Sequence, residues 1–162
     1  MSNNCSLEQF WRGWHSSFNK WIVRYMYRPL GGRETRVWSI WPIFLFVAIW
    51  HDIEMKLMVW GLMNSFFFVL EVGAKRLAQT ETMRALPHSL FKVVCVLSGA
   101  TYVLVLVCVN LVGYSVGVAG VKTMAVKLLT WEGLKVLLVC YYFLCIAVSF
   151  MGYLQRKGWA KK

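Results

Sequence analysis

Two histidines stand beside residues that could support proton transfer. His51 ends an apolar run and is followed by Asp52 and Glu54, and His15 precedes Asn19 by one helical turn. A neutral imidazole in an apolar pocket can act as a general base near neutral pH, because burial lowers its pKa and leaves one ring nitrogen free to accept a proton. The neighbouring carboxylates could orient the ring or bind a cation, or they could form a solvated helix cap. The pattern predicts general-base chemistry at His51, with a satisfied helix terminus as the alternative.

His15 and Asn19 belong to an aromatic and basic segment, residues 10–28. On a helical wheel its aromatic side chains share one face, and its Lys and Arg side chains share the other. Such a helix lies in the membrane interface, and a proline followed by a pair of glycines ends it. His15 and Asn19 fall on the border between the two faces. There they could point at one buried cavity, or reach lipid headgroups as polar residues at such borders usually do.

The composition is that of a membrane protein. Of the 162 residues, 59% are hydrophobic and only 15% are charged, which is too apolar for an ordinary soluble domain. Four apolar runs predict an all-α polytopic bundle of about four membrane helices, over residues 37–50, 55–70, 93–120 and 136–154. A short charged linker separates the last two runs. The net charge of +11 is spread between the runs, which suits cytoplasmic loops facing anionic lipid and argues against nucleic-acid binding.

This pattern divides the chain into four segments. Residues 1–36 hold the amphipathic interfacial helix and a basic Pro-Gly-Gly loop, and residues 37–71 hold a short pair of membrane helices. Residues 72–92 form a polar cytoplasmic loop, and residues 93–162 hold two further membrane helices and a basic C-terminal tail. The first apolar run is shorter than the roughly 20 residues that cross a bilayer core. The short pair therefore either turns at the interface or dips into a polar cavity at membrane depth.

The five cysteines show neither CxxC spacing nor a histidine at zinc-binding spacing. Four of them lie inside apolar runs, and the set is Cys5, Cys95, Cys108, Cys140 and Cys145. We expect them to be buried thiols that form no disulfide and bind no metal.

Three ordered motifs resemble the membrane-bound O-acyltransferase family. The first is aromatic-Trp-Arg-x-Trp-His, beginning at Phe10. The second is Trp-Ile-Val-Arg-Tyr-x-Tyr-x-Pro-Leu-Gly-Gly, ending at Gly32, and the third is Trp50-His51, about 20 residues later. The resemblance covers roughly residues 8–75, and the second motif is most similar to the branch that holds the yeast glycerol uptake proteins and the Hedgehog acyltransferases.

The resemblance implies transfer of a fatty acyl group from acyl-CoA to a hydroxyl of a lipid or glycolipid, of the type that remodels GPI anchors, in the endoplasmic reticulum membrane. Glycerol uptake would be a secondary consequence. The resemblance implies that His51 is the catalytic base and that His15 is the second polar position, which orients a substrate or the donor carbonyl. Asn19, which stands where other members of this branch have a different polar residue, and Trp50 are candidate substrate contacts. Candidate partners for the CoA phosphates, or equally for lipid headgroups, are the basic side chains Lys20, Arg24 and Arg28. No bound cofactor is expected, and no acyl-enzyme, since no cysteine lies in the motifs.

Family members are several times longer than this chain and have more membrane helices. The chain therefore resembles the C-terminal catalytic part of such an enzyme, and we expect a missing N-terminal half or a partner subunit to complete the substrate tunnel. Two alternatives are a component of a polyol (glycerol) transporter and a non-catalytic membrane fragment that kept the motifs by descent. A transporter should show paired carboxylates or interrupted helices in an internal repeat, and the sequence has neither.

Overall fold

The computed structural model describes residues 7–157 and is built from helices. The N-terminal part comprises α1 (Leu7–Gly13), α2 (Ser16–Ile22) and the π-helical turn η1 (Val23–Tyr27). The middle part comprises α3 (Arg36–His51), α4 (Met55–Leu77) and the short α5 (Glu81–Arg84). The C-terminal part comprises α6 (His88–Leu111), the π-helical turn η2 (Val112–Val116), α7 (Gly117–Leu128) and α8 (Trp131–Arg156). The predicted all-α class is confirmed.

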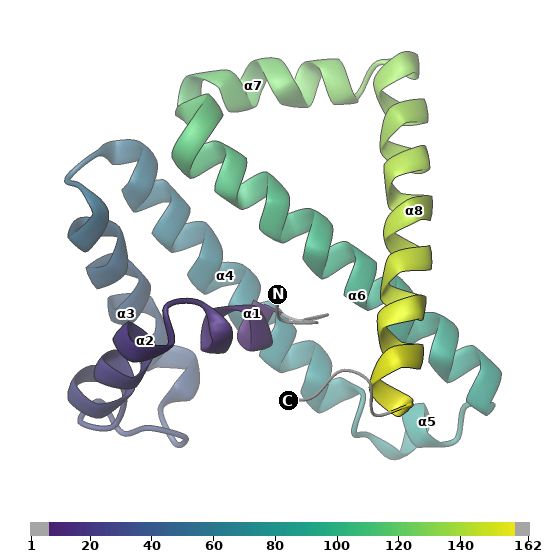
Figure 1. The fold of residues 1–162 in the computed structure, drawn as a ribbon, viewed down its shortest axis with the longest axis horizontal. Coiled ribbons are helices and arrows are strands. Elements are labelled where there is room, and N and C mark those ends of the chain that lie inside the picture. The colour runs from purple at the N-terminus through teal and green to yellow at the C-terminus, as the bar shows by residue number, and fades with distance from the viewer. Residues whose placement is uncertain (1–6, 158–162) are drawn as a thin grey trace.

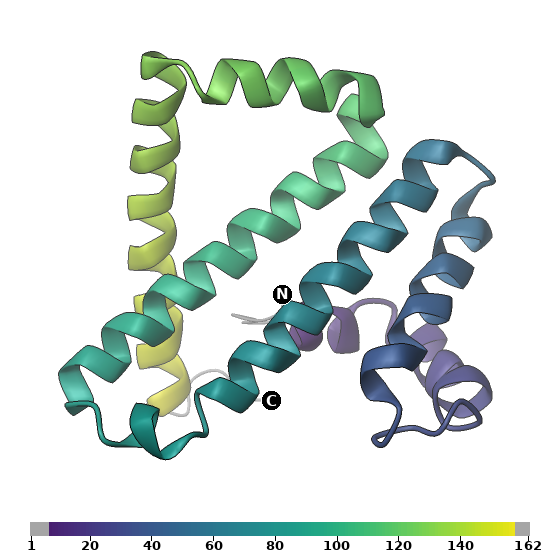
Figure 2. The same cartoon turned by 180° about the vertical axis from the view of Figure 1, so that it is seen from behind.

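Helices α3 and α4 form an antiparallel hairpin on one side of the molecule, at the left in Figure 1. Helix α6 lies alongside α4, and α8 crosses α6 near the start of α6 and diverges from it toward α7, which connects their far ends. The view from behind shows α1 and α2 against the lower half of the hairpin, at the same end of the molecule as α5 (Figure 2). The basic segments around α2 and α5 therefore share one end of the bundle, which agrees with their lying on the same side of a membrane.

Three helices are long and apolar enough to cross a membrane, and these are Met55–Leu77, His88–Ser115 and Trp131–Arg156. Helix α3 is apolar but has only 16 residues. At 1.5 Å per residue it is about 24 Å long, which is less than the roughly 30 Å of a bilayer core. Of the four expected membrane helices, three have spanning length, and α3 is too short to span at right angles to the membrane.

The interface between α3 and α4 forms the core. One cluster of buried side chains contains Val47, Ala48, Leu57, Trp60 and Val109, and a second contains Ile40, Phe44, Phe68 and Val72. At Gly61 the two helices come close, because a Cβ there would lie 2.9 Å from the backbone oxygen of Phe44. Small residues allow this close packing between membrane helices. Trp11 and Phe18 pack on the first cluster, so the N-terminal helices bury aromatic side chains against the hairpin.

Residues 10–28 do not form the single helix predicted from the helical wheel. Helix α1 ends at Gly13, and His15 adopts a left-handed conformation with φ 39° before α2 begins. Glycine weakens a helix by roughly 1 kcal/mol. The indole of Trp14, beside it, packs against the rings of His15 and His51. We attribute the break to these contacts together with Gly13, which outweigh the hydrogen bonds of one helical turn.

Two further boundaries differ from the sequence pattern. Helix α4 continues past residue 71 to Leu77, so that Lys75 and Arg76 lie in its last turn. Basic side chains favour this position because the C-terminal end of a helix carries a partial negative charge. The expected charged linker between the last two membrane helices is largely helical and contains α7, which follows a turn at Gly117 with φ 66°.

The expected burial of the cysteines is wrong for two of them. Cys95 and Cys140 are exposed, Cys108 and Cys145 are half-buried, and all four are free thiols. The helices that carry them are apolar on their outer faces, where lipid replaces a protein neighbour. Cys5 lies outside the described residues.

Candidate functional site

His51 lies at the C-terminal end of α3, within an aromatic cage formed by Trp14, Trp50, Trp60 and Tyr114. The centroids of these four rings lie 5.9, 5.1, 6.0 and 5.7 Å, respectively, from the imidazole centroid. The rings come from the turn between α1 and α2, from α3, from α4 and from η2. The Nε2 atom of His51 is buried and has no hydrogen-bond partner among the residues that the structure describes. A nitrogen in this state is available to accept a proton from a substrate.

The protonation of His51 follows from this environment. His51 lies outside the three candidate spans, and burial lowers its pKa from the ordinary value. The positive charge that His15 can carry lowers the pKa of His51 further. The imidazole is therefore neutral at neutral pH, which is the state that a general base requires.

The two carboxylates that follow His51 act within the turn between α3 and α4. The Asp52 side chain accepts a 2.7 Å hydrogen bond from the backbone N–H of Ile53. Glu54 forms an ion pair with Lys56 at 2.6 Å. These contacts hold both carboxylates within the turn, and the Glu54 side chain makes no capping hydrogen bond to α4.

His15 and Asn19 have different surroundings. The His15 ring meets Trp14 edge-on, with centroids 4.3 Å apart, and the residue is exposed. Its left-handed backbone costs roughly 1–3 kcal/mol for a non-glycine residue, and such strain concentrates at functional sites. The Asn19 side chain instead donates a hydrogen bond to the backbone oxygen of Trp11 and lines a cavity. His15 lies on the side of the aromatic cage, and Asn19 lies on the side of the cavity.

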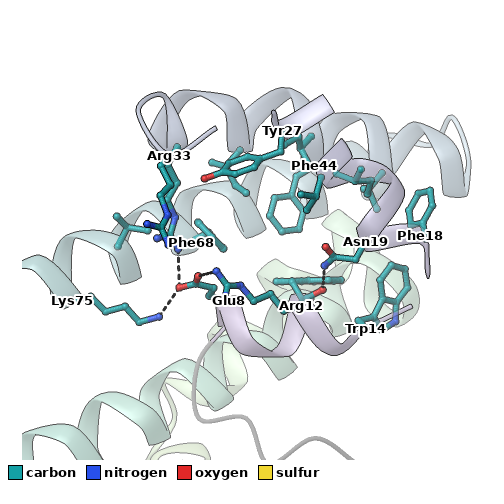
Figure 3. A pocket seen from close by; sticks show the side chains of 18 of the residues that line it. Glu8, Arg12, Trp14, Phe18, Asn19, Tyr27, Arg33, Phe44, Phe68 and Lys75 are labelled. Atoms are coloured by element: carbon teal, nitrogen blue, oxygen red, sulfur yellow. Dashed lines mark hydrogen bonds and ion pairs between the residues drawn. The ribbon is translucent and has the colours of Figure 1, made fainter. Parts of the chain in front are cut away.

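A cavity of about 480 Å³, which we call the α3 cavity, lies between the N-terminal helices and the α3–α4 hairpin (Figure 3). Its apolar wall includes Ile40, Phe44, Phe68 and Val72. The cavity follows one face of α3 from Arg36 to Val47, a rise of about 16 Å at 1.5 Å per residue. Trp14 also lines the cavity and contacts His51 on its other side. The cavity therefore ends one aromatic ring away from the imidazole.

The other end of the α3 cavity is cationic, and its basic side chains are Arg12, Arg33, Arg36, Lys75 and Arg76. Glu8 reaches into this group and forms ion pairs of 2.7 Å with Arg36 and 2.9 Å with Lys75 (Figure 3). Lys75 also pairs with the buried Glu71 at 2.6 Å. Five basic side chains face two carboxylates here, so the end of the cavity keeps a positive charge that suits an anion.

The three basic residues expected to contact phosphates lie together. Lys20, Arg24 and Arg28 line a second cleft of about 390 Å³, the Lys20 cleft, with Asn19 and Val23. All three are exposed. The structure brings them together on the outer side of α2 and η1, apart from the cationic end of the α3 cavity.

Comparison with known protein families identifies the family of this chain. The model of MBOAT, the membrane-bound O-acyltransferase family, matches residues 1–112, which include both His15 and His51. The chain belongs to the membrane-bound O-acyltransferase family. The resemblance in the three sequence motifs is thereby confirmed.

Two yeast proteins extend this assignment within the membrane-bound O-acyltransferases. The chain is 38% identical over 152 residues to membrane-bound O-acyltransferase GUP1 of Saccharomyces cerevisiae, which covers 93% of this chain and 26% of that protein. It is 37% identical over 155 residues to GUP1 of Millerozyma farinosa, which covers 94% of this chain and 29% of that protein. The chain thus spans about a quarter of the length of these curated relatives and corresponds to their C-terminal part.

A bacterial relative is similar to this chain over a shorter range of residues than the GUP1 proteins. The peptidoglycan O-acetyltransferase of Helicobacter pylori is 29% identical over 63 residues, which covers 36% of this chain and 12% of that protein.

Sequence reasoning missed several residues of this membrane-bound O-acyltransferase site. Trp60 and Tyr114 lie inside apolar runs, where nothing in the local sequence separates them from other membrane-facing aromatic residues. Arg33 and Arg36 follow the double glycine, and in the sequence only their positive charge indicated that they could bind an anion. Among the residues that the structure describes, no three His, Cys, Asp or Glu side chains converge to hold a metal ion.

Proposed function

We propose that this chain is the catalytic part of an acyltransferase of the endoplasmic reticulum membrane. It moves a fatty acyl group from acyl-CoA to a hydroxyl of a membrane lipid or glycolipid, as in the remodelling of GPI anchors. The observation that carries the proposal is the buried, unpartnered Nε2 of His51 inside the aromatic cage. Because the chain spans 26% of the S. cerevisiae relative, we propose that a further polypeptide segment or a partner subunit completes the tunnel around both substrates.

In the proposed reaction, Nε2 of His51 accepts the proton of the acceptor hydroxyl. The hydroxyl oxygen attacks the carbonyl carbon of the thioester, the carbon–sulfur bond breaks, and CoA leaves as a thiolate. The imidazolium then returns its proton to the thiolate sulfur. The products are an ester and free CoA, and His51 is neutral again. A thioester is already activated, so the protein mainly positions the two substrates and moves one proton.

The charge of the α3 cavity supports an anionic donor. Arg33 and Arg76 line its cationic end and form no ion pair with a carboxylate among the described residues, whereas Arg36 and Lys75 share Glu8. Guanidinium groups bind phosphate oxygens with two parallel hydrogen bonds. A donor with its phosphates at this end would extend along α3 toward His51. In this proposal the Lys20 cleft offers a second contact for phosphates or for lipid headgroups.

His15 is proposed as the second polar group of the reaction, orienting the donor carbonyl or the acceptor. Its ring lies beside Trp14, which is part of the aromatic cage. The strained backbone of His15 supports this role, since local strain persists where the surrounding structure holds a residue in a required orientation.

The test compares two histidine variants in native membranes, which contain the full chain together with the segment or partner subunit that completes the tunnel. The chain, His51→Ala and the control His88→Ala are incubated with radiolabelled palmitoyl-CoA, and labelled lipid and released CoA thiol are measured. His88 is exposed at the start of α6, so its loss leaves the cage intact. We expect His51→Ala to lose about 10²- to 10⁴-fold in transfer rate, the usual contribution of a general base, and His88→Ala to match the unmodified chain.

Equal transfer by His51→Ala at normal abundance would contradict the role of His51. Polyol flux through purified liposomes without any acyl product would favour the transporter alternative. The absence of transfer by the unmodified chain, at normal abundance in its native membrane, would contradict the proposed function.

A further inference from the structure

The π-helical turn η2 brings a distant part of the chain to His51. The Tyr114 ring meets the His51 ring at 83° with centroids 5.7 Å apart, and meets the Trp60 ring at 72° and 5.6 Å. Both are edge-to-face contacts, the favoured arrangement for aromatic pairs. The rest of the cage comes from residues 14–60, so η2 adds a wall that the N-terminal motifs do not contain. π-Helical turns within longer helices are frequent at functional sites.

Gly113 allows η2 to approach α4 this closely. A Cβ built on Gly113 would lie 2.7, 2.8 and 2.9 Å from three atoms of the Trp60 side chain. Ordinary carbon–carbon contacts are about 3.5 to 4.0 Å, so a larger residue would have to displace either η2 or the indole. Trp60 is only 1% exposed, and its Nε1 donates a 3.2 Å hydrogen bond to Asn110. Burial and the hydrogen bond to Asn110 therefore fix the Trp60 indole, so a side chain at Gly113 would displace η2.

Gly117 defines the other end of this turn. Its φ of 66° and ψ of 178° lie in a region that is essentially restricted to glycine. The chain changes direction there and enters α7. Glycines on both sides of Tyr114 thus fix where η2 touches α4 and where it stops.

We propose that η2 is a positioning element of the acyl-transfer site, in which Tyr114 holds the His51 ring in its reactive orientation and Gly113 seats η2 on Trp60. This inference rests on the proposed function of His51. Tyr114 does not line the α3 cavity, so its contribution is to the orientation of the base and not to binding of the donor.

The Tyr114 ring, although 52% exposed itself, covers one side of the imidazole through this edge-to-face contact. Burial is the largest cause that lowers the pKa of His51. Among the described residues, the titratable side chains that face the His51 ring are His15, from the turn before α2, and Tyr114, from η2. Helix α4 contributes Trp60, which does not titrate. Loss of the Tyr114 ring therefore exposes His51 to water and raises its pKa toward the ordinary value. A change that only destabilises the fold would lower activity without moving the pH profile.

The experiment uses the full chain in membranes with palmitoyl-CoA as donor, and measures kcat, the donor KM and the pH profile. For Tyr114→Ala we expect a kcat lower by about ten- to hundredfold, the scale of a small misplacement of reacting groups, with an unchanged donor KM. Its acid limb should move to higher pH. Tyr114→Phe keeps the ring and should restore both the rate and the profile. Gly113→Ala should resemble Tyr114→Ala, and the control Gly152→Ala, which meets nothing within 4 Å, should resemble the unmodified chain.

Each outcome separates this inference from the proposed function. If His51→Ala is inactive while Tyr114→Ala keeps the unmodified kcat and pH profile, the positioning role is wrong and the general base stands. If Tyr114→Phe is as impaired as Tyr114→Ala, the hydroxyl is required and the role of the ring is overturned. If His51→Ala is fully active, the proposed function itself fails. Should Gly113→Ala not accumulate, the two Tyr114 variants decide the matter alone.

Discussion

Adding one methyl group at Gly61 is expected to push α3 away from α4 and to disturb the helix end that carries His51. The new Cβ would lie 2.9 Å from the backbone oxygen of Phe44 and 3.2 Å from Cβ of Ala48. A backbone oxygen cannot rotate away as a flexible side chain can. The two helices would have to separate by about 0.6 Å to restore an ordinary contact of about 3.5 Å.

The change in the free energy of unfolding of Gly61→Ala is the sum of two opposing effects. Replacing a glycine inside a helix by alanine stabilises the helix by about 1 kcal/mol. Overpacking a close interface costs about 1–3 kcal/mol. Gly73 lies on the same helix, and a Cβ there meets nothing within 4 Å, so Gly73→Ala shows the first effect alone. We expect Gly73→Ala to raise the free energy of unfolding by about 1 kcal/mol, and Gly61→Ala to leave it unchanged or lower it by about 2 kcal/mol.

The assay is a titration of the detergent-solubilised chain with SDS, followed by tryptophan fluorescence. Trp60 and Trp11 lie in or against the core beside Gly61 and report separation of the helices. The unfolding free energies of the two variants should differ by about 1–3 kcal/mol, and acyl transfer should fall in Gly61→Ala only. Equal unfolding free energies for Gly61→Ala and Gly73→Ala would refute the steric reasoning. Full activity in a destabilised Gly61→Ala would show that the position of His51 does not depend on this contact.

Three further predictions concern polar contacts and backbone strain. Burial raises the pKa of Glu8, but hydrogen bonds from Lys75 and Arg36 outweigh this effect and lower the pKa overall. The free energy of unfolding that Glu8 contributes is therefore complete above its ordinary pKa. It is lost as the pH falls through the lowered pKa. Unfolding titrations from pH 7 to 3 should show a smaller loss of stability in Glu8→Gln than in the unmodified chain. Trp60→Phe removes the donor to Asn110 and should cost about 1–3 kcal/mol in the SDS titration; a cost below 0.5 kcal/mol would mean that the Asn110 oxygen finds another donor. Asparagine adopts the left-handed backbone readily, so His15→Asn should have the same free energy of unfolding as the unmodified chain. His15→Ala should be about 1 kcal/mol less stable. Equal free energies of unfolding for the two variants would contradict this prediction.

Much of the fold could be predicted from the sequence. In a bilayer every backbone polar group must be paired within its own segment, so a long uncharged run becomes a helix whatever its neighbours are. The spans over α6 and α8 follow from this rule, and the candidate residues His15 and His51 could be found because their motifs are local in the chain. The helical wheel failed at His15 because it assumes an unbroken helix, whereas Trp14 at the break contacts His51, a residue distant in the sequence.

Only the tertiary structure decided which side chains surround the candidate base. Tyr114 reaches His51 because Gly113 lets η2 lie against Trp60, and no local pattern marks that contact. The cationic end of the α3 cavity likewise joins residues from α1, α3 and α4 around Glu8. The sequence by itself determined the long apolar helices and the family, and it marked the two histidines as candidates, because apolar length and motif spacing are properties of neighbouring residues. The cage and the cavity arise from packing between segments far apart in the chain, where shape complementarity and charge pairing depend on the folded arrangement.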